Sequence, residues 1–314
     1  SMSALYMANK ANNVFELRDA LMKIPAPIQN VMAADVSGNI AFFSTGSVPL
    51  RENHRGVFPV PGWKKEYEWK GWTKKENMPF GMNVKEMMLA NNNNLVHDPA
   101  KNLPIFHIDA AASHRFDRIN EIASPDLDLK RLRSFQTDHF LKRAELITPI
   151  LLSDLESVSS LNDIELKAYN ILKAWKFESS VTSAGASIFF LTYKKAVHKA
   201  LEKKVSKGLA RAFLKQRYSP GITDTWFLNK DHIIWGDRGP VITKAFREAI
   251  KELSQDLGQD PQKWAWGNLH SIRPSHPFGK RKILSFFNLD KFPLAGGFDS
   301  LWKAHFNFED PKSY

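Results

Sequence analysis

The sequence predicts an α+β fold, because its residue patterns change twice along the 314 residues. Residues 1–118 place short apolar runs between Gly, Pro, Asn and Trp, which favours strands joined by long loops. Residues 119–258 contain capping and helix-ending residues around longer segments, which favours helices. Residues 259–314 return to Gly, Pro, aromatic residues and His, so we expect an irregular part with strands. No internal repeat or linker marks a domain boundary between the three parts.

The first expected elements are a short helix and a hairpin. Residues 13–24 (NVFELRDALMKI) indicate a helix that ends before Pro25. Residues 31–34 and 40–43 are apolar runs on either side of Asp-Val-Ser-Gly-Asn. This turn composition supplies local side-chain hydrogen bonds and a glycine that tolerates positive φ, so we expect a β-hairpin over residues 31–43.

A loop rich in aromatic residues follows the hairpin. Residues 56–72 (GVFPVPGWKKEYEWKGW) contain two prolines and three glycines, which favours an irregular, partly extended chain. Its aromatic side chains are Phe58, Trp63, Tyr67, Trp69 and Trp72. We expect them to cover an apolar surface, either by packing the loop onto a sheet or by forming a wall of an apolar pocket.

Helices are expected in the central part of the chain. Ser153 and Ser160 each stand before acidic residues, which is the pattern of helix N-caps. Residues 237–258 run from a Gly-Pro break to Gly258, which is typical of one long helix.

The net charge of +11 raises the hypothesis of a nucleic-acid or anionic-surface binder. In the densest basic stretch, residues 194–217, Lys195, Lys199 and Lys203 fall on one face of a helix. Such a face is most often simply solvated, and no zinc-finger, RNA-recognition or basic-zipper pattern accompanies it. No apolar run reaches the length of a membrane span. We therefore expect neither a nucleic-acid nor a membrane partner.

The residues by themselves name no enzyme. The absence of cysteine excludes disulfides, Cys-ligated zinc and a Cys nucleophile. No Walker loop, dinucleotide fingerprint or nucleophile elbow is present. His107, Asp109 and His114 are close in sequence, and His270 and His276 are six residues apart, but neither spacing matches a standard metal site. One unusual feature is a run of four asparagines, residues 91–94, because Asn is a poor former of helices and strands.

An ordered series of segments resembles the penicillin acylase family and spans essentially the whole chain. The segments are PIQNVMAADVSGNIAFFSTGSVPLR, PVPGW, YEWKGW, MPFGMN, LANNNN, SHRFDRI, WKFESSVTSAGASIFF, WAWGNLHSIRPSHPFG and FNLDKFPLAGGFDS. No single segment is decisive, but their order is specific. The sequence departs from the family pattern at Lys176, where Asp is common, and at Val84, where Pro is usual.

The resemblance implies part of the αββα sandwich of the N-terminal nucleophile hydrolases, with a large helical insertion at residues 119–258. It implies hydrolysis of an N-acyl amide, with β-lactam side-chain amides and acyl-homoserine lactones as candidate small-molecule substrates. It also implies a periplasmic or secreted protein. A bound calcium is common in the family, but most of its carboxylate ligands would lie outside this chain. We therefore expect no required cofactor and assign no metal ligand.

The resemblance further implies an internal part of an acylase β subunit. The family's nucleophile is the N-terminal Ser of that subunit, and its own α-amino group is the base. That Ser lies far upstream of the ADVSGNI segment, and Ser1 is too close to replace it. The expected partners are therefore the upstream part of the β subunit and the α subunit, and the chain alone is expected to be inactive.

Three site residues follow from matching the family segments. Asn93 matches the oxyanion-hole donor, and a neutral Asn side chain can stabilise a tetrahedral oxyanion without adding a proton equilibrium. Arg115 matches the arginine near the active centre, with a structural ion pair as the alternative. Gln29 falls where the family lines its acyl pocket, with packing in a sheet as the alternative. For the whole chain, the alternatives are a non-catalytic relic of the fold and a basic nucleic-acid binder.

Overall fold

The computed structural model divides the chain into two compact units. Unit 1 comprises residues 1–116 and 120–127, and unit 2 comprises residues 117–119 and 128–314. The structure describes residues 1–84, 88–92, 94, 96, 112–124, 126–157, 160–215 and 219–304.

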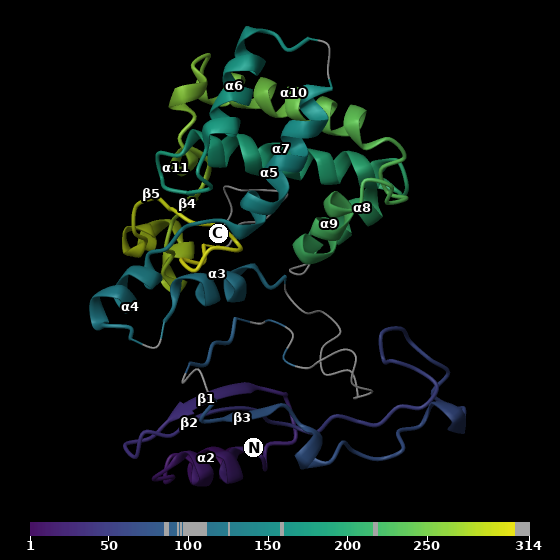
Figure 1. The fold of residues 1–314 in the computed structure, drawn as a ribbon, viewed down its shortest axis with the longest axis vertical. Coiled ribbons are helices and arrows are strands. Elements are labelled where there is room, and N and C mark those ends of the chain that lie inside the picture. Colours follow the sequence, from purple (N-terminus) through teal and green to yellow (C-terminus); the bar gives the residue numbers. More distant parts are fainter. Residues whose placement is uncertain are drawn as a thin grey trace. The chain divides into compact units, whose positions relative to one another are not determined.

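Unit 1 is built on a three-stranded antiparallel sheet in the order β1-β2-β3 (Figure 1). Its elements are α1 (Met2–Ala8), α2 (Val14–Leu21), β1 (Asn30–Ala34), β2 (Ile40–Ser44), the short 3-10 turns η1 (Lys65–Tyr67) and η2 (Lys75–Asn77), and β3 (Phe80–Met82). Helix α2 contacts the sheet at β2. The small core between them consists of Val14, Met22, Ala41, Phe43, Val48 and Met78.

The expected helix and hairpin are both confirmed. Helix α2 begins after Asn13, whose side chain accepts a hydrogen bond from the Glu16 N–H at 2.9 Å. Strands β1 and β2 pair with Ala34 opposite Ile40 at the turn. The Asp35 carboxylate closes this turn by accepting hydrogen bonds from the N–H groups of residues 37 and 39.

For four of the five aromatic side chains of the loop, the expected packing is not present within unit 1; the fifth, Tyr67, is half-buried and contacts His54 edge to face. Phe58 is 80% exposed and Trp63 is 86% exposed, and Trp69 and Trp72 are each 54% exposed. The two latter rings contact each other edge to face, with centroids 5.3 Å apart. Within unit 1 these four side chains therefore cover neither a sheet nor a pocket.

Unit 2 is mainly helical, and its last part is irregular (Figure 1). Its helices are α4 (Leu129–Gln136), α5 (Lys142–Glu156), α6 (Asp163–Ala174), α7 (Ala184–Glu202), α8 (Lys207–Leu214), α9 (Ser219–Leu228), α10 (Arg238–Leu257) and α11 (Trp266–Leu269). Helix α3 (His114–Ile122) has residues in both units. The shorter elements are η3 (Pro261–Lys263), β4 (Ser271–Ile272), η4 (Pro277–Lys280), η5 (Lys282–Phe287) and β5 (Phe292–Pro293).

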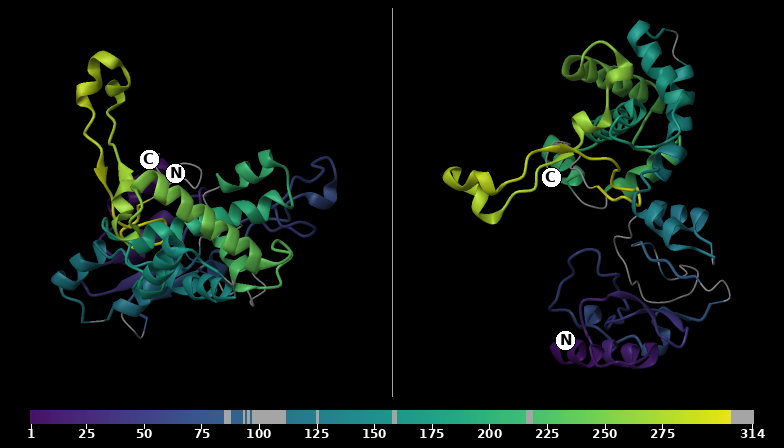
Figure 2. Two further views of the ribbon diagram at one scale, coloured as in Figure 1. Left: turned by 90° about the horizontal axis from the view of Figure 1, so that it is seen from above. Right: turned by 90° about the vertical axis from the view of Figure 1, so that its left-hand side faces the viewer.

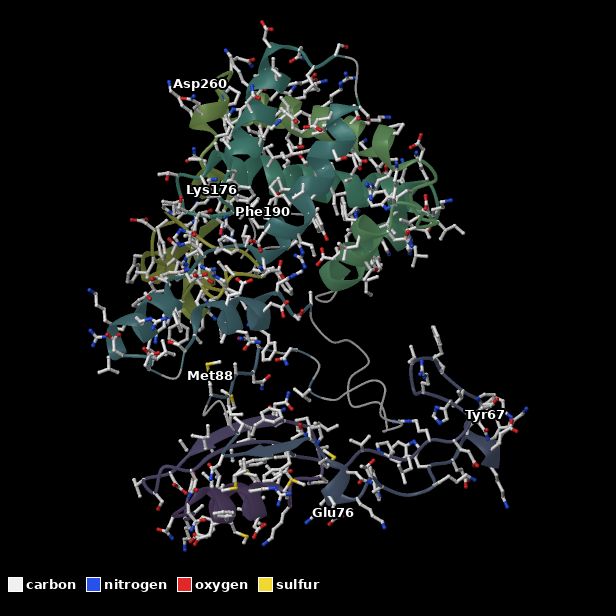
Figure 3. All side chains as sticks on the ribbon, in the orientation of Figure 1. Tyr67, Glu76, Met88, Lys176, Phe190 and Asp260 are labelled. Carbon is white, nitrogen blue, oxygen red and sulfur yellow. The ribbon has the colours of Figure 1, made fainter. Side chains whose placement is uncertain are left out.

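Helix α7 is the centre of unit 2, where it contacts α6, α8, α10 and α11. Its first half is apolar on all sides, which is the pattern of a helix that is buried all round. Phe190 on this helix stacks on Trp266 with ring centroids 4.6 Å apart, and it lies inside the unit (Figure 3). At Gly185, a Cβ would lie 2.3 Å from the Trp175 ring, so only glycine allows this close approach.

Buried charges join the helices of unit 2. The Arg143 guanidinium on α5 donates to Asp224 on α9 at 2.8 Å and also forms an ion pair with Asp299. The Tyr193 hydroxyl on α7 donates to the same Asp224 at 2.7 Å. Burial is the largest cause of the raised pKa of Tyr193, and the nearby Asp224 charge adds to it. The buried cluster therefore keeps the Tyr193 phenol neutral and the Arg143 guanidinium charged.

Two sequence expectations about unit 2 have different outcomes. The serine caps are wrong, because Ser153 lies inside α5 and the cap of α6 is Asn162, which forms a capping box with Glu165. The long helix expected at residues 237–258 is confirmed as α10.

The basic face of α7 is largely paired. Lys195 lies 2.6 Å from Glu252 and Lys199 lies 2.6 Å from Glu248, and both glutamates are on α10. Two of the three lysines on this basic face therefore form ion pairs with glutamates of the neighbouring helix.

Candidate functional site

The run of four asparagines, residues 91–94, is called the Asn-rich segment, and it contacts the start of α3 in unit 1. The Arg115 guanidinium donates a hydrogen bond from Nη2 to the Asn92 carbonyl oxygen at 3.0 Å. In the reverse direction, the Asn92 side-chain amide lies 3.5 Å from the Arg115 carbonyl oxygen, at the limit of a hydrogen bond. The side chain of each residue thus contacts the backbone carbonyl of the other. These contacts join two segments that lie 23 residues apart in sequence.

Asn94 braces the segment from inside. It is buried, and its side-chain oxygen accepts a hydrogen bond from the Asn92 N–H at 3.1 Å. This is the local side-chain-to-backbone contact that Asn favours in turns. Asn93 lies outside the described residues, but both of its neighbours are fixed by these contacts. The run of asparagines therefore includes at least two residues, Asn92 and Asn94, that hold the shape of the segment.

Helix α3 positions Arg115 on its first turn. His114, the first residue of the helix, is buried, and Arg115 next to it is half-buried. Further along, Arg118 forms a two-pronged ion pair with Asp138 in unit 2, with distances of 2.7 and 3.1 Å to one carboxylate oxygen. Arg115 therefore holds the Asn-rich segment, whereas Arg118 forms a separate structural ion pair.

Gln29 lies immediately before β1, where its backbone continues the pairing with the strand β2. Its carbonyl oxygen accepts from the Thr45 N–H at 2.8 Å, and its N–H donates to the Thr45 hydroxyl at 3.2 Å. The side chain is exposed. Within the described part of the chain, no hydrogen bond joins Gln29 to Asn92 or Arg115. The structure thus brings the Asn-rich segment and Arg115 together, whereas Gln29 is placed by the sheet.

Sequence reasoning assigns the asparagines other than Asn93 to contacts with the backbone of their own loop. Asn94 confirms this expectation, because its side chain accepts a hydrogen bond from the Asn92 N–H. The pattern does not show that Arg115 donates to a backbone carbonyl, because an arginine in a sequence is more readily paired with a carboxylate than with a peptide oxygen.

The described residues assign no metal ligand. Among them, no group of three His, Asp or Glu side chains lies close enough together to hold a metal ion. His107 and Asp109 lie outside the described residues. His270 is buried in unit 2, where its Nδ1 contacts the Leu294 carbonyl oxygen at 2.8 Å and its ring stacks on Trp266.

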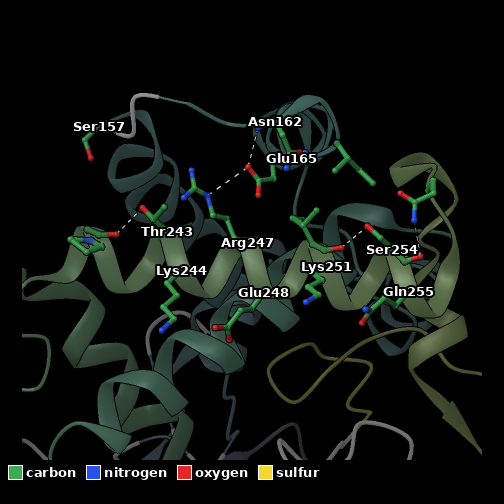
Figure 4. A pocket seen from close by; sticks show the side chains of 15 residues that line it. Ser157, Asn162, Glu165, Thr243, Lys244, Arg247, Glu248, Lys251, Ser254 and Gln255 are labelled. Carbon is green, nitrogen blue, oxygen red and sulfur yellow. Dashed lines mark hydrogen bonds and ion pairs between the residues drawn. The ribbon is translucent and has the colours of Figure 1, made fainter.

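Unit 2 has a groove of its own. A cavity of about 940 Å³ runs between α6 and α10 (Figure 4). Arg247 on α10 points across it toward Glu165 on α6, with Nε and Oε2 3.7 Å apart. None of the residues that line this groove belongs to the predicted catalytic set. In the part of the chain that the structure describes, no helix combines the length and the apolarity of a membrane span.

In the described residues, the side chain of Arg115 thus holds the Asn-rich segment through a backbone carbonyl. The fold and these segments match one family. The family model for penicillin amidase matches residues 1–313, so the chain belongs to the penicillin amidase family.

Similar proteins agree with this assignment. The chain is 24% identical over 307 residues to the acyl-homoserine lactone acylase QuiP of Pseudomonas fluorescens (strain Pf-5), covering 90% of this chain and 38% of that protein. It is 28% identical over 306 residues to the penicillin acylase 2 proenzyme of Pseudomonas sp. (strain SE83), covering 93% of this chain and 38% of that protein. The chain thus spans well under half the length of these relatives.

A solved structure shows the same fold. The thermostable penicillin G acylase from Alcaligenes faecalis superposes with a TM-score of 0.66 at 18% identity. The match covers 83% of this chain and 52% of that chain. The expected mixed helix-and-strand class is thereby confirmed, and the fold is similar to that of a penicillin G acylase.

Proposed function

We propose that the chain is part of an amidohydrolase that cleaves N-acyl amides, and that it contributes the oxyanion side of the active site. The observation that supports this most is the contact between Arg115 and the Asn92 carbonyl oxygen at 3.0 Å. It fixes the backbone next to Asn93, the residue that matches the family's oxyanion donor. A preorganised donor stabilises the developing charge without reorganisation during the reaction.

In the proposed mechanism, the nucleophile is a serine on polypeptide that this chain does not contain. Its attack on the amide carbon forms a tetrahedral intermediate, and the amine then leaves to give an acyl-enzyme that water hydrolyses. The Asn93 side-chain N–H donates to the oxyanion. Arg115 holds the Asn-rich segment in place, and its positive charge favours the anionic intermediate. Gln29 contributes to the acyl pocket.

The proposed substrates are small-molecule N-acyl amides, either acyl-homoserine lactones or β-lactam side-chain amides. The printed names of the two relatives include one acylase of each kind, which supports this range. The proposed location is the periplasm or the cell exterior, and the proposed partners are the upstream β-subunit part and the α subunit. Calcium in the whole acylase would be held by residues outside the described part of this chain.

The test is steady-state hydrolysis by the intact acylase, which contains these residues and the nucleophile. Release of free amine from a long-chain acyl-homoserine lactone, or from a penicillin, would support the proposal. Absence of turnover with both classes, by a protein that is folded by circular dichroism, would contradict it and favour a non-catalytic relic of the fold.

A further inference from the structure

The segment between β4 and β5 extends out of unit 2 as an arm. Strands β4 and β5 pair antiparallel at its base, with Ile272 opposite Phe292. The arm, residues 273–291, contains the short turns η4 and η5 and projects away from the helices of its own unit (Figure 2). It has almost no interior, because Gly279 is the only buried residue in η4 and none is buried in η5.

The shape of the arm is nevertheless fixed by polar contacts. The Asn288 side chain accepts from the His276 N–H at 2.9 Å and donates to the Gly279 carbonyl oxygen at 3.1 Å. A Cβ at Gly279 would lie 1.9 Å from the Asn288 side-chain oxygen, so this clamp requires glycine. The arm is therefore a preformed element and does not depend on hydrophobic packing for its conformation.

The fixed arm presents large apolar side chains to solvent. Ile283 is 83% exposed, Phe286 is 72% exposed, Phe278 is 63% exposed and Leu289 is 61% exposed. Single exposed apolar residues are ordinary, but several on one short ordered projection form a patch that is typical of an interaction surface.

The arm is also strongly basic. Its charged residues are the five cations Arg273, Lys280, Arg281, Lys282 and Lys291 and one carboxylate, Asp290, which gives a net charge of +4. Within the described residues, no ion pair involves any of these cations. A surface that covers the arm would therefore have to be apolar at its centre and bordered by carboxylates.

We propose that the arm docks onto the part of the acylase polypeptide that this chain lacks, in an apolar hollow bordered by Asp or Glu. The proposal rests on the proposed function, in which that polypeptide supplies the nucleophile. Two observations favour this occupant. The relatives contain much more polypeptide than the 38% that the chain spans, and the +4 charge of the arm would complement an acidic surface on that polypeptide. A second copy of the chain and an anionic lipid surface are the competing occupants.

Hydroxyl-radical footprinting with mass spectrometry tests the proposal on two samples, the 314-residue chain and the product of the complete gene. We expect Phe278 and Phe286 to be labelled in the chain alone and to lose that label in the complete product. Equal labelling in both samples overturns the proposal, including the case in which the complete product is no longer than this chain. Loss of label at high concentration of the chain alone, with a dimer in sedimentation velocity, assigns the arm to a second copy. Loss only with phosphatidylglycerol vesicles assigns it to lipid.

A pair of matched variants adds a thermodynamic readout. Ile283→Asp on the arm and Ile233→Asp on the α9–α10 connection replace isoleucines that are 83% and 80% exposed. We expect Ile283→Asp to lower the Tm of the complete product by about 5 °C and to leave the chain alone unchanged, because only docking buries Ile283. Equal Tm shifts for Ile283→Asp in the two samples contradict docking. Footprinting does not depend on catalysis. A complete product in which the arm is protected but which has no activity would therefore contradict the proposed function and still support docking of the arm.

Discussion

The Arg115 guanidinium donates to the Asn92 carbonyl oxygen at 3.0 Å, which ties the first turn of α3 to the middle of the asparagine run. The next residue, Asn93, is the member of the run that matches the family's oxyanion donor in sequence. The bond also gives Arg115 a positioning role that does not require contact with the substrate.

Replacement of Arg115 by Met should therefore loosen the Asn-rich segment and reduce kcat/KM of the intact acylase. Loss of a charge-assisted hydrogen bond of about 1.5–3 kcal/mol corresponds to a reduction of about 10- to 150-fold. The amide hydrogen exchange of Asn92 should accelerate in parallel, since its N–H bond to Asn94 is part of the same segment. Arg115→Lys should restore part of the activity. If exchange is unchanged while activity falls, Arg115 acts on the substrate and does not position the segment.

Asn93→Ala should reduce kcat of the intact acylase by about 10²- to 10³-fold, with a small effect on KM. The reason is that the oxyanion exists in the transition state and not in the bound substrate. Asn91→Ala is the matched control, because it changes the same run without removing the proposed donor. Asn94 is no neutral control, since its buried side chain braces Asn92. A rise in KM alone for Asn93→Ala would assign it to substrate binding.

The purified 314-residue chain should show no hydrolysis of acyl-homoserine lactones or of a chromogenic acyl anilide. The physical reason is that the roles proposed for Asn93 and Arg115 stabilise a tetrahedral intermediate, whereas forming one requires a nucleophile. Measurable turnover would require a nucleophile in this chain. Loss of that turnover in a Ser1→Ala variant would then identify Ser1.

Removing the cation of the buried cluster in unit 2 should be strongly destabilising. In Arg143→Met, Asp224 and Asp299 would remain buried without their ion-pair partner, at a cost of about 3–5 kcal/mol. Lys173→Met is the control, because Lys173 and its partner Glu156 are both more than half exposed and 3.6 Å apart. That surface pair should contribute far less, because water screens exposed charges. Equal effects in urea unfolding would contradict the assignment of the cluster as a structural core.

The hairpin turn should make unit 1 less stable in acid. Hydrogen bonds from the Asn39 side chain are the largest cause of the lowered pKa of Asp35. A lowered folded-state pKa means that the stabilisation is complete above the unfolded-state pKa of about 4 and is lost as the pH falls through the folded-state value. The difference in free energy of unfolding between the wild type and Asp35→Asn should thus be constant from about pH 7 to pH 5 and shrink below pH 4. A difference that stays constant down to pH 2 would contradict this.

The sequence alone predicts those elements whose formation depends on residues that are adjacent in the chain. The hairpin over residues 31–43 and the helix ends at Asn13 and Gly258 follow from turn and capping chemistry, which acts over a few residues. The start of α6 shows the limit of such reasoning. Ser160 and Asn162 both have the chemistry of a cap, and only the folded backbone selects Asn162, whose capping box places Glu165 against α10.

By itself, the sequence determined the α+β class, the family segments and the local elements, because these depend on patterns of residue types. Tertiary structure decided which distant residues meet. Arg115 bonds a backbone carbonyl 23 residues away, Lys199 bonds Glu248 on another helix, and Trp63 remains exposed although it is aromatic. Each outcome depends on where the chain returns in space. A side chain's type fixes what it can bind, whereas the fold fixes which partner lies within hydrogen-bond distance.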